Sequence, residues 1–400
     1  MTELDSQLGN GASSGFTSLE PEPRAEFIAP PFTLPPYPYD RLKPVLQAAD
    51  MHPGGAIDLS IGTPCDQPPE NVCEALRDTS SVAGYPTSVG SAALLEAAHG
   101  WLERRIGVRL GSGSLANCIG TKELVAGLPL ILKLRSPRRD TVLYPAVAYP
   151  TYEMGAILAG CRAVAVPVDD QWRIDLSSIS SADAERALCL WVNTPGNPAG
   201  ALDDLDAAAE WGRTHGIPVL SDECYIEFTW QGPPRTILRS GPEGVLAVHS
   251  LSKRSNFAGG RAGFYAGDAD LVRFVSEVRK HQGLMIPAPV QRGAAVAWSE
   301  DSHVDVQRDR YHRRLVRLAA QFTRLGLAPT LPEGAFYLWV HAPDGAWETA
   351  SRLADSVGVV VSPGEFYGAA GAAYLRIAAV QPDERLDLLD QRIQAWEAQQ

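Results

Sequence analysis

The sequence predicts an α/β fold: a mainly parallel central sheet with helices on both faces, plus a smaller α+β domain. Over residues 55–289, short apolar runs alternate with longer amphipathic stretches, which is typical of parallel strands joined by helices. After residue 289 the pattern changes to long helical stretches followed by short strands. This change predicts a second domain of different architecture.

The individual elements follow from these patterns. In the larger domain, strands are predicted at residues 57–61, 141–144, 163–166, 187–192, 218–220, 245–249 and 263–266. Helices are predicted between them at residues 91–105, 122–134, 151–159, 203–215 and 268–282. The smaller domain is predicted to contain helices at 290–299 and 304–326, strands at 336–340, 359–361 and 374–378, and a last helix.

These elements suggest three parts of the chain. Residues 1–36 are rich in Gly, Ser, Pro and Glu without periodicity, and they predict a flexible N-terminal arm. Residues 55–289 form the large domain. Residues 37–54 and 290–400 together form the small α+β domain.

The composition excludes several function classes. The 400 residues include 35 Lys+Arg and 47 Asp+Glu, a net charge of −12, so bulk charge does not favour nucleic acid or an anionic membrane. No apolar run approaches the roughly 18 residues of a membrane helix. The polar start of the chain lacks a secretory signal, and the six cysteines form no CxxC pair. We therefore expect a cytoplasmic protein with buried free thiols.

Three short motifs match known functional signatures but lack the sequence context that those signatures require. Gly111-Ser-Gly113-Ser-Leu-Ala116 matches a dinucleotide fingerprint, but neither a clean strand before it nor a helix directly after it is predicted, so we interpret it as a loop. Gly11-Ala-Ser13-Ser-Gly15 resembles a nucleophile elbow but lies in the arm. Ser250-Leu-Ser-Lys253 matches the S-x-x-K motif of serine hydrolases, without their K-T-G or S-D-N partners. No His or Cys spacing indicates a metal site.

One lysine stands out as a possible nucleophile. The chain has only five lysines, and arginine cannot take this role because it keeps its proton. Lys253 alone follows a buried strand, in a turn that also contains Ser250 and Ser252. The carboxyl ends of parallel strands are where open α/β sheets bind ligands. Lys253 and the two serines are therefore candidate ligands of a cofactor.

The side chains that accompany Lys253 suit pyridoxal phosphate (PLP). This cofactor needs an amine for a Schiff base, an anion opposite its ring nitrogen, partners for its ring hydroxyl and a stacking face. Asp222 ends a buried strand and suits the ring nitrogen, while Tyr225 and Asn197 suit the hydroxyl. Tyr149 provides an aromatic plate. Each residue alone has an ordinary structural explanation; their coincidence favours the cofactor.

A phosphate site completes this set. Gly120, Thr121 and Lys122 begin a predicted helix, whose N-terminus presents backbone donors to an anion. Arg261, eight residues after Lys253, can pair with phosphate through two hydrogen bonds. The sequence therefore predicts a PLP-binding protein.

The chain also resembles a known family. The resemblance rests on eight stretches: Leu59-Ser-Ile-Gly-Thr-Pro64, Gly84-Tyr-Pro-Thr87, Gly120-Thr-Lys-Glu-Leu-Val-Ala126, Ala148-Tyr-Pro-Thr-Tyr-Glu153, Ser221-Asp-Glu-Cys-Tyr225, His249-Ser-Leu-Ser-Lys-Arg-Ser-Asn256, Pro287-Ala-Pro-Val-Gln291 and Pro363-Gly-Glu-Phe-Tyr-Gly368. They are similar to those of class I/II aminotransferases, the fold-type-I PLP enzymes, and most similar to actinobacterial succinyldiaminopimelate aminotransferases. The stretches extend from about residue 37 to the C-terminus.

The resemblance implies specific roles. Lys253 would bind PLP covalently, with Asp222 and Tyr225 as its catalytic partners. Arg376 would bind the substrate α-carboxylate, helped by Gly62 and Asn197. Tyr85 would reach a phosphate in the neighbouring subunit, which implies a homodimer. The implied reaction transfers an amino group between an amino acid, succinyldiaminopimelate-like or other, and a 2-oxo acid.

The sequence departs from the family pattern at two places. Gly260 stands where relatives usually have a tyrosine beside the phosphate arginine, and Gly196-Asn-Pro-Ala-Gly200 replaces Ser-Asn-Pro-Thr-Gly. Losing a ring removes on the order of 150–250 Å² of buried surface. We therefore expect room for a different or bulkier substrate.

Other functions stay open at this point. The same cofactor supports β/γ-elimination or γ-replacement on a methionine-derived or sulfonium amino acid, and fold does not choose between these outcomes. A serine hydrolase using Ser250, a silent PLP-binding regulator and a pure binding module are further alternatives. Residues 1–36 are too short and acidic for the DNA-binding module that such a regulator carries.

Overall fold

A computed structural model describes residues 32–400. Pro38–Gln400 form one compact unit, and Met1–Tyr37 belong to another. Of the latter, residues 32–37 are described and contain no helix or strand. The flexible arm predicted for residues 1–36 and the motif at Gly11–Gly15 therefore lie largely or wholly outside the described residues.

The central sheet has seven strands in the order β2-β8-β7-β6-β5-β3-β4. Their bounds are β2 (Leu115–Cys118), β3 (Thr141–Pro145), β4 (Arg162–Val166), β5 (Ala187–Asn193), β6 (Val219–Asp222), β7 (Val245–Ser250) and β8 (Gly263–Gly267). Only β8 runs antiparallel to its neighbours in this sheet. The mainly parallel sheet is confirmed, but β2, which begins where a loop was predicted, was missed.

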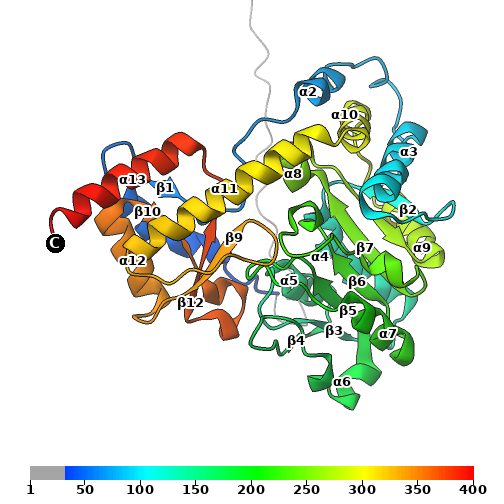
Figure 1. Ribbon diagram of the computed structural model, residues 1–400. Helices are drawn as coiled ribbons and strands as arrows, with labels where there is room; N and C mark the ends of the chain where they lie inside the picture. The colour runs from blue at the N-terminus through cyan, green and yellow to red at the C-terminus, as the bar shows by residue number, and fades with distance from the viewer. Residues whose placement is uncertain (1–31) are drawn as a thin grey trace, which may run out of the picture. The chain divides into compact units, whose positions relative to one another are not determined.

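Helices cover both faces of this sheet (Figure 1). One face packs against α3 (Ala92–Trp101), α7 (Leu205–His215) and α10 (Ala288–Ser299). The other packs against α4 (Thr121–Arg135), α5 (Thr151–Leu158) and α9 (Ala269–His281). Because side chains alternate along a strand, β7 sends Val245 and Ala247 to the first face and Leu246 and Val248 to the second. Burial on both faces explains why these strands are continuous apolar runs.

The chain after α10, together with α1 and β1 from the start of the described residues, builds a smaller lobe (Figure 1). Its elements are α1 (Lys43–Asp50), β1 (Ile57–Asp58), α11 (Ser302–Arg324), β9 (Tyr337–His341), α12 (Ala346–Val357), β10 (Val359–Val360), β11 (Ser362–Pro363), β12 (Tyr374–Ala378) and α13 (Asp383–Glu397). The antiparallel sheet β11-β12-β9 and the parallel pair β1-β10 share one apolar core. The prediction missed α12, and β1, assigned to the larger domain, pairs here. The boundary at residue 55 stays a prediction.

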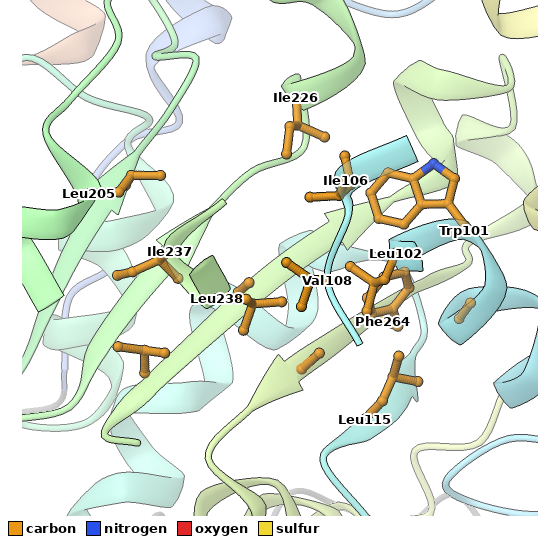
Figure 2. Close-up of a cluster of buried hydrophobic side chains, with 14 of the residues drawn as sticks. Trp101, Leu102, Ile106, Val108, Leu115, Leu205, Ile226, Ile237, Leu238 and Phe264 are labelled. Carbon is orange, nitrogen blue, oxygen red and sulfur yellow. The ribbon is translucent and has the colours of Figure 1, made fainter. Parts of the chain in front are cut away.

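Short elements connect these layers. They are α2 (Glu70–Leu76), α6 (Ser181–Arg186) and α8 (Leu251–Arg254), with a π-helical turn at Leu102–Ile106 after α3. Figure 2 shows Trp101 at the end of α3, near Leu102, Ile106 and Phe264 in the core of the first face. Within residues 32–400, every helix falls short of the length or apolar character that a membrane crossing requires.

The cysteines differ from the prediction. All six are free, but only Cys118 and Cys189 are buried. Cys65 is exposed and the other three are half-buried. Cys65 precedes Asp66 in a loop where Arg314 binds the aspartate, so polar contacts rather than apolar packing surround it.

Candidate functional site

The site begins where β5, β6 and β7 end side by side. Asn193 on β5 is paired in register with Asp222 on β6, and Asn193 Nδ2 donates to the Asp222 carbonyl at 2.8 Å. Asn193 Oδ1 accepts from the backbone N–H of Asn197 at 2.8 Å. Lys253 follows β7 in α8. The sheet thus brings together residues that lie 60 positions apart, as the sequence predicted.

Lys253 is the half-buried amine of this cluster. Its Nζ donates to the carbonyl of Gly62 and lies 5.7 Å from the centroid of the Phe336 ring. Burial, followed by the positive charge of Arg376, lowers the pKa of Lys253 to about 8. About a tenth of the amine is therefore neutral, and nucleophilic, at pH 7.

Asp222 is the buried carboxyl opposite the lysine. Its Oδ2 accepts from the Tyr152 hydroxyl at 2.9 Å and its Oδ1 from the Cys224 backbone N–H at 3.2 Å. Burial raises the pKa of Asp222, and these hydrogen bonds together with the charge of Lys253 oppose that rise. Neutral donors hold this carboxyl, so a cationic partner is still to be supplied.

Tyr152 is a site residue that the sequence reasoning missed. Its ring stacks on Trp191 at 5.0 Å with an interplanar angle of 24°, and Tyr149 meets its edge at 5.9 Å. The signal was present, because Tyr152 lies one helical turn after Tyr149 within the quoted stretch 148–153. Tyr149 was the residue expected to stack on the cofactor, and the structure places it beside Tyr152.

A second group of residues surrounds the N-terminus of α4. Gly120 has φ +68°, and a Cβ atom there would collide with the Arg261 guanidinium, so only glycine fits. Arg261 Nη1 donates to the Ala258 carbonyl at 2.9 Å. Thr121 Oγ1 accepts from the thiol of Cys224 at 3.3 Å. Gly120, Thr121 and Arg261 thus converge as predicted.

The other residues predicted for the cofactor lie as follows. Ser250 caps α8, and its Oγ accepts from the Ser252 backbone N–H at 3.1 Å. Lys122 is exposed. Tyr85 is 99% exposed and is not part of the cluster within one chain.

Arg376 forms the opposite wall of the site, on β12. It is 2% exposed. Its Nη1 donates to Asn197 Oδ1 at 2.8 Å, and its Nη2 donates to the Ser60 carbonyl at 2.6 Å and to the Tyr39 hydroxyl at 3.2 Å. Nε is buried without a hydrogen-bond partner among the described residues. Because Nε and Nη2 form one edge of the guanidinium, a carboxylate could bind that edge if it replaced the Tyr39 hydroxyl on Nη2.

Three tyrosines surround this guanidinium, and sequence reasoning assigned none of them. The Tyr337 and Tyr367 rings lie 4.2 and 4.7 Å from the Arg376 guanidinium carbon, and the Tyr39 hydroxyl lies 2.7 Å from that of Tyr367. Tyr337 was interpreted only as a strand residue. Tyr367 lies within a quoted stretch.

Tyr225 and Gly62 both contact Tyr337. The Tyr225 and Tyr337 hydroxyls are 2.8 Å apart, so Tyr225, expected to serve the cofactor hydroxyl, has a phenol partner in this structure. A Cβ atom at Gly62 would collide with the Tyr337 hydroxyl. Glycine at position 62 therefore allows its carbonyl to reach Lys253.

The expectation of extra room at Gly260 is wrong at the position of the side chain. A Cβ atom on Gly260 would collide with the ring of Phe257, which is itself buried. The phenylalanine three residues earlier occupies the space, so the glycine accommodates Phe257 and does not open a cavity at this point.

The residues present fit pyridoxal phosphate. A partly neutral lysine, a buried carboxyl held by neutral donors, and an arginine beside a glycine-led helix N-terminus match the aldehyde, the ring nitrogen and the phosphate in turn. Fold and site together define the class of a fold-type-I PLP enzyme.

Comparison with known proteins agrees. Residues 55–393 match the family model described as aminotransferase class I and II, and the chain belongs to this family. Enzymes of this fold and class depend on PLP, so the protein is a PLP-dependent aminotransferase.

Individual relatives cover nearly the whole chain. It is 40% identical over 363 residues to 4-dedimethylamino-4-oxo-anhydrotetracycline transaminase OxyQ of Streptomyces rimosus, covering 88% of this chain and 97% of that protein. It is 32% identical to LL-diaminopimelate aminotransferase of Aquifex aeolicus, with 88% and 94% covered. The solved structure of a probable N-succinyldiaminopimelate aminotransferase from Thermus thermophilus superposes with TM-score 0.80 at 29% identity, with 90% and 99% covered.

Proposed function

We propose that Lys253 binds the cofactor of this aminotransferase covalently through Nζ and that Asp222 holds the ring-nitrogen proton. The observation that carries this proposal is the burial of one amine and one carboxyl at adjoining strand ends, with the amine kept partly neutral. When bound, PLP supplies the aldehyde that carries the amino group and a ring that accepts electrons from the substrate Cα. Lys253, freed when the substrate amine takes its place on the aldehyde carbon, would move the proton from the substrate Cα to that aldehyde carbon, first as a base and then as an acid.

The positions of other residues in the site suggest the remaining contacts with the cofactor. Gly120, Thr121 and the backbone of Lys122 hold the phosphate at the helix N-terminus, together with Arg261. The serines that flank Lys253 line the same turn, Tyr149 stacks on the ring, and Tyr225 and Asn197 serve its hydroxyl.

Arg376 binds the α-carboxylate of the substrate. Its unpartnered Nε is the supporting observation, because a buried charged donor left unpaired is costly and a carboxylate would complete it. The reaction thus exchanges an amino group between an α-amino acid, succinyldiaminopimelate-like or other, and a 2-oxo acid. The relatives reported above are all named as transaminases or aminotransferases, so the elimination alternative is not carried further.

A ring ketone is a second candidate acceptor. The relative that is 40% identical is named for 4-dedimethylamino-4-oxo-anhydrotetracycline, whose name includes an oxo group. In this chain, Trp339 lies opposite Arg376 in the register of β9 and β12, and its ring stacks on Tyr374 at 5.3 Å with planes 7° apart. Trp172 meets Tyr374 edge-on at 4.7 Å. This aromatic wall favours a flat substrate.

We also infer a homodimer in which a second copy supplies Tyr85. The supporting observation is the full exposure of Tyr85 beside the exposed apolar residues Val82 and Val89. Light scattering gives the oligomeric state, and Tyr85→Phe should weaken PLP binding in the dimer. A monomeric protein, or a Tyr85→Phe variant that binds PLP as tightly as the wild type, would contradict this inference.

One experiment tests the proposed function directly. The protein loaded with PLP should show the visible absorbance band of the lysine-bound cofactor, and Lys253→Ala should remove both the band and activity. Lys280→Ala, which removes a lysine 57% exposed on α9, is the matched control and should change neither. The loaded protein is then mixed with single amino acids and ring ketones, and keto-acid, aminated and elimination products are measured separately. An unchanged band in Lys253→Ala would refute the lysine assignment.

A further inference from the structure

Two buried titratable residues lie directly behind the site and take no part in the chemistry described above. Glu223 follows Asp222 at the end of β6, and His249 precedes Ser250 at the end of β7. Since side chains alternate along a strand, Asp222 faces Tyr152 on one side of the sheet while Glu223 and His249 face the other. Glu223 is 0% and His249 1% exposed.

Aromatic rings enclose the imidazole on that side. Trp101 and Phe264 each have ring centroids 4.9 Å from that of His249. Figure 2 shows these two rings in the core formed with Leu102 and Leu115. The pair therefore lies in an apolar environment where an isolated charge is strongly disfavoured.

Polar atoms of Glu223 and His249 lack hydrogen-bond partners among the described residues. Glu223 Oε1 accepts from Ser221 Oγ and from the Ile237 backbone N–H, both at 2.8 Å. Glu223 Oε2 lies 3.4 Å from His249 Nε2. Neither of these two atoms, nor His249 Nδ1, has a hydrogen-bond partner among the described residues. A carboxylate lone pair facing an imidazole lone pair would leave both unsatisfied, whereas one proton between them joins both. Either Glu223 or Nε2 of the neutral imidazole can carry that proton, and the charge balance around Glu223 distinguishes the two cases.

The charged groups near this face do not supply a counter-ion to Glu223. Glu227 accepts from Arg254 at 3.0 Å, from Arg105 at 2.9 Å and from Trp101 Nε1 at 2.8 Å, so this cluster is paired internally. On the strand itself, the neighbouring charged group is Asp222, of the same sign as an ionised Glu223. A proton is the available way to neutralise Glu223.

We propose that Glu223 is a protonated carboxylic acid that donates to His249 Nε2, and that this neutral pair is a positioning element behind Asp222. Burial favours the neutral form of both side chains. It raises the pKa of Glu223 to about 7 and lowers that of His249 to about 3. The pair hydrogen-bonds the end of β6 to the end of β7, the strands that lead to Asp222 and Lys253.

The neutral pair has an electrostatic consequence, which rests on the proposed role of Asp222. A second negative charge on the adjacent residue would raise the pKa of Asp222 and disfavour its ionised form. With Glu223 neutral, Asp222 acts without that repulsion. The pair thus helps Asp222 without touching cofactor or substrate.

Infrared spectroscopy of the PLP-loaded protein tests the protonation state. At pH 6 the carbonyl band of a buried carboxylic acid should be present, should shift in D₂O, and should be missing in Glu223→Gln. Glu277→Gln, which changes an exposed carboxyl on α9, is the matched control and should keep the band. His249→Gln should move the band, because the acid then donates to a different acceptor. A spectrum at pH 6 without any band that Glu223→Gln removes would overturn the proposal.

Kinetics test the positioning role. Glutamine is a neutral isostere that can still donate to the imidazole, so Glu223→Gln should keep kcat within about twofold and leave the pH titration of the cofactor absorbance in place. A tenfold or larger loss of kcat in folded Glu223→Gln would mean that the negative charge is needed. The acid band depends on Glu223 alone, so it remains informative even if Lys253→Ala refutes the proposed function.

Discussion

The two halves of the site are built in different ways. The cofactor half, the part of the site that we propose binds PLP, contains Asp222, Lys253 and Arg261. It is assembled from the ends of neighbouring strands and the loop after β7. The substrate half is assembled from side chains distant in sequence: Tyr39 precedes α1, and Arg376 lies on β12. The register of the buried sheet determines where the residues of the cofactor half lie. The packing of the smaller lobe determines where those of the substrate half lie.

This difference has a chemical counterpart. In the cofactor half the charged groups have neutral hydrogen-bond partners within the chain. Asp222 accepts from neutral donors, and Arg261 donates to a backbone carbonyl. In the substrate half Arg376 already has three acceptors within the chain, and only Nε is left. Substitutions should therefore reduce kcat in the first half and alter substrate affinity in the second.

The largest expected effect is that of Asp222→Asn. Asparagine keeps an oxygen for Tyr152 but removes the charge that holds the ring-nitrogen proton. We expect kcat to fall by about two to three orders of magnitude, with little change in KM. Steady-state kinetics measure this, and the exposed Asp344→Asn serves as the control. A variant with wild-type kcat would break the assignment of Asp222.

Arg376→Lys should show the opposite behaviour. Lysine keeps the charge but loses the fork of two parallel donors, so KM for α-amino acids should rise by about a hundredfold, or 2.7 kcal/mol. Amines without a carboxylate should be much less affected. Kinetics on a matched pair of donors measure the contrast, with the exposed Arg77→Lys as control. Equal effects on both donors would contradict carboxylate binding by Arg376.

The sequence predicted the cofactor half of the site better than the substrate half. The parallel strands were readable because burial on both faces leaves continuous apolar runs, and Lys253, Asp222 and Asn197 were found because each follows such a run. Strand β2 was missed because its four residues, Leu115–Cys118, include the polar Asn117 and follow a Gly-rich stretch. The pairing of β1 with β10 joins residues about 300 apart, which no local pattern encodes.

The tyrosines of the site show most clearly what the sequence could not predict. Tyr39, Tyr152, Tyr337 and Tyr367 all shape the site, yet each hydroxyl acquires its role only from a partner distant in sequence. At Gly260 the departure from the family pattern was visible, but its consequence depended on the position of the Phe257 ring.

Uptake of PLP by the apoprotein should depend on pH through Lys253. Burial depresses the pKa of this amine to about 8, so its neutral, reactive fraction decreases as the pH falls below that value. The rate of band formation should therefore rise about tenfold per pH unit below pH 8 and level off above it. Stopped-flow absorbance at several pH values measures the midpoint. A midpoint near 10.5, the ordinary value for lysine, would contradict the burial of Lys253 in solution.

Tyr39→Phe should give the smallest effect and the finest test of the substrate half. The Tyr39 hydroxyl lies on Arg376 Nη2, beside the free Nε, where one carboxylate oxygen is expected to bind. A substrate carboxylate must displace this hydroxyl, so phenylalanine should lower KM for α-amino acids by about threefold while kcat stays unchanged. Loss of the bonds to Arg376 and Tyr367 should cost about 1 kcal/mol of folding stability. Kinetics and urea unfolding measure the two effects, with Tyr37→Phe, an exposed tyrosine two residues earlier, as control. A raised KM would instead mean that the hydroxyl itself binds the carboxylate, which would make Tyr39 a ligand that acts together with Arg376.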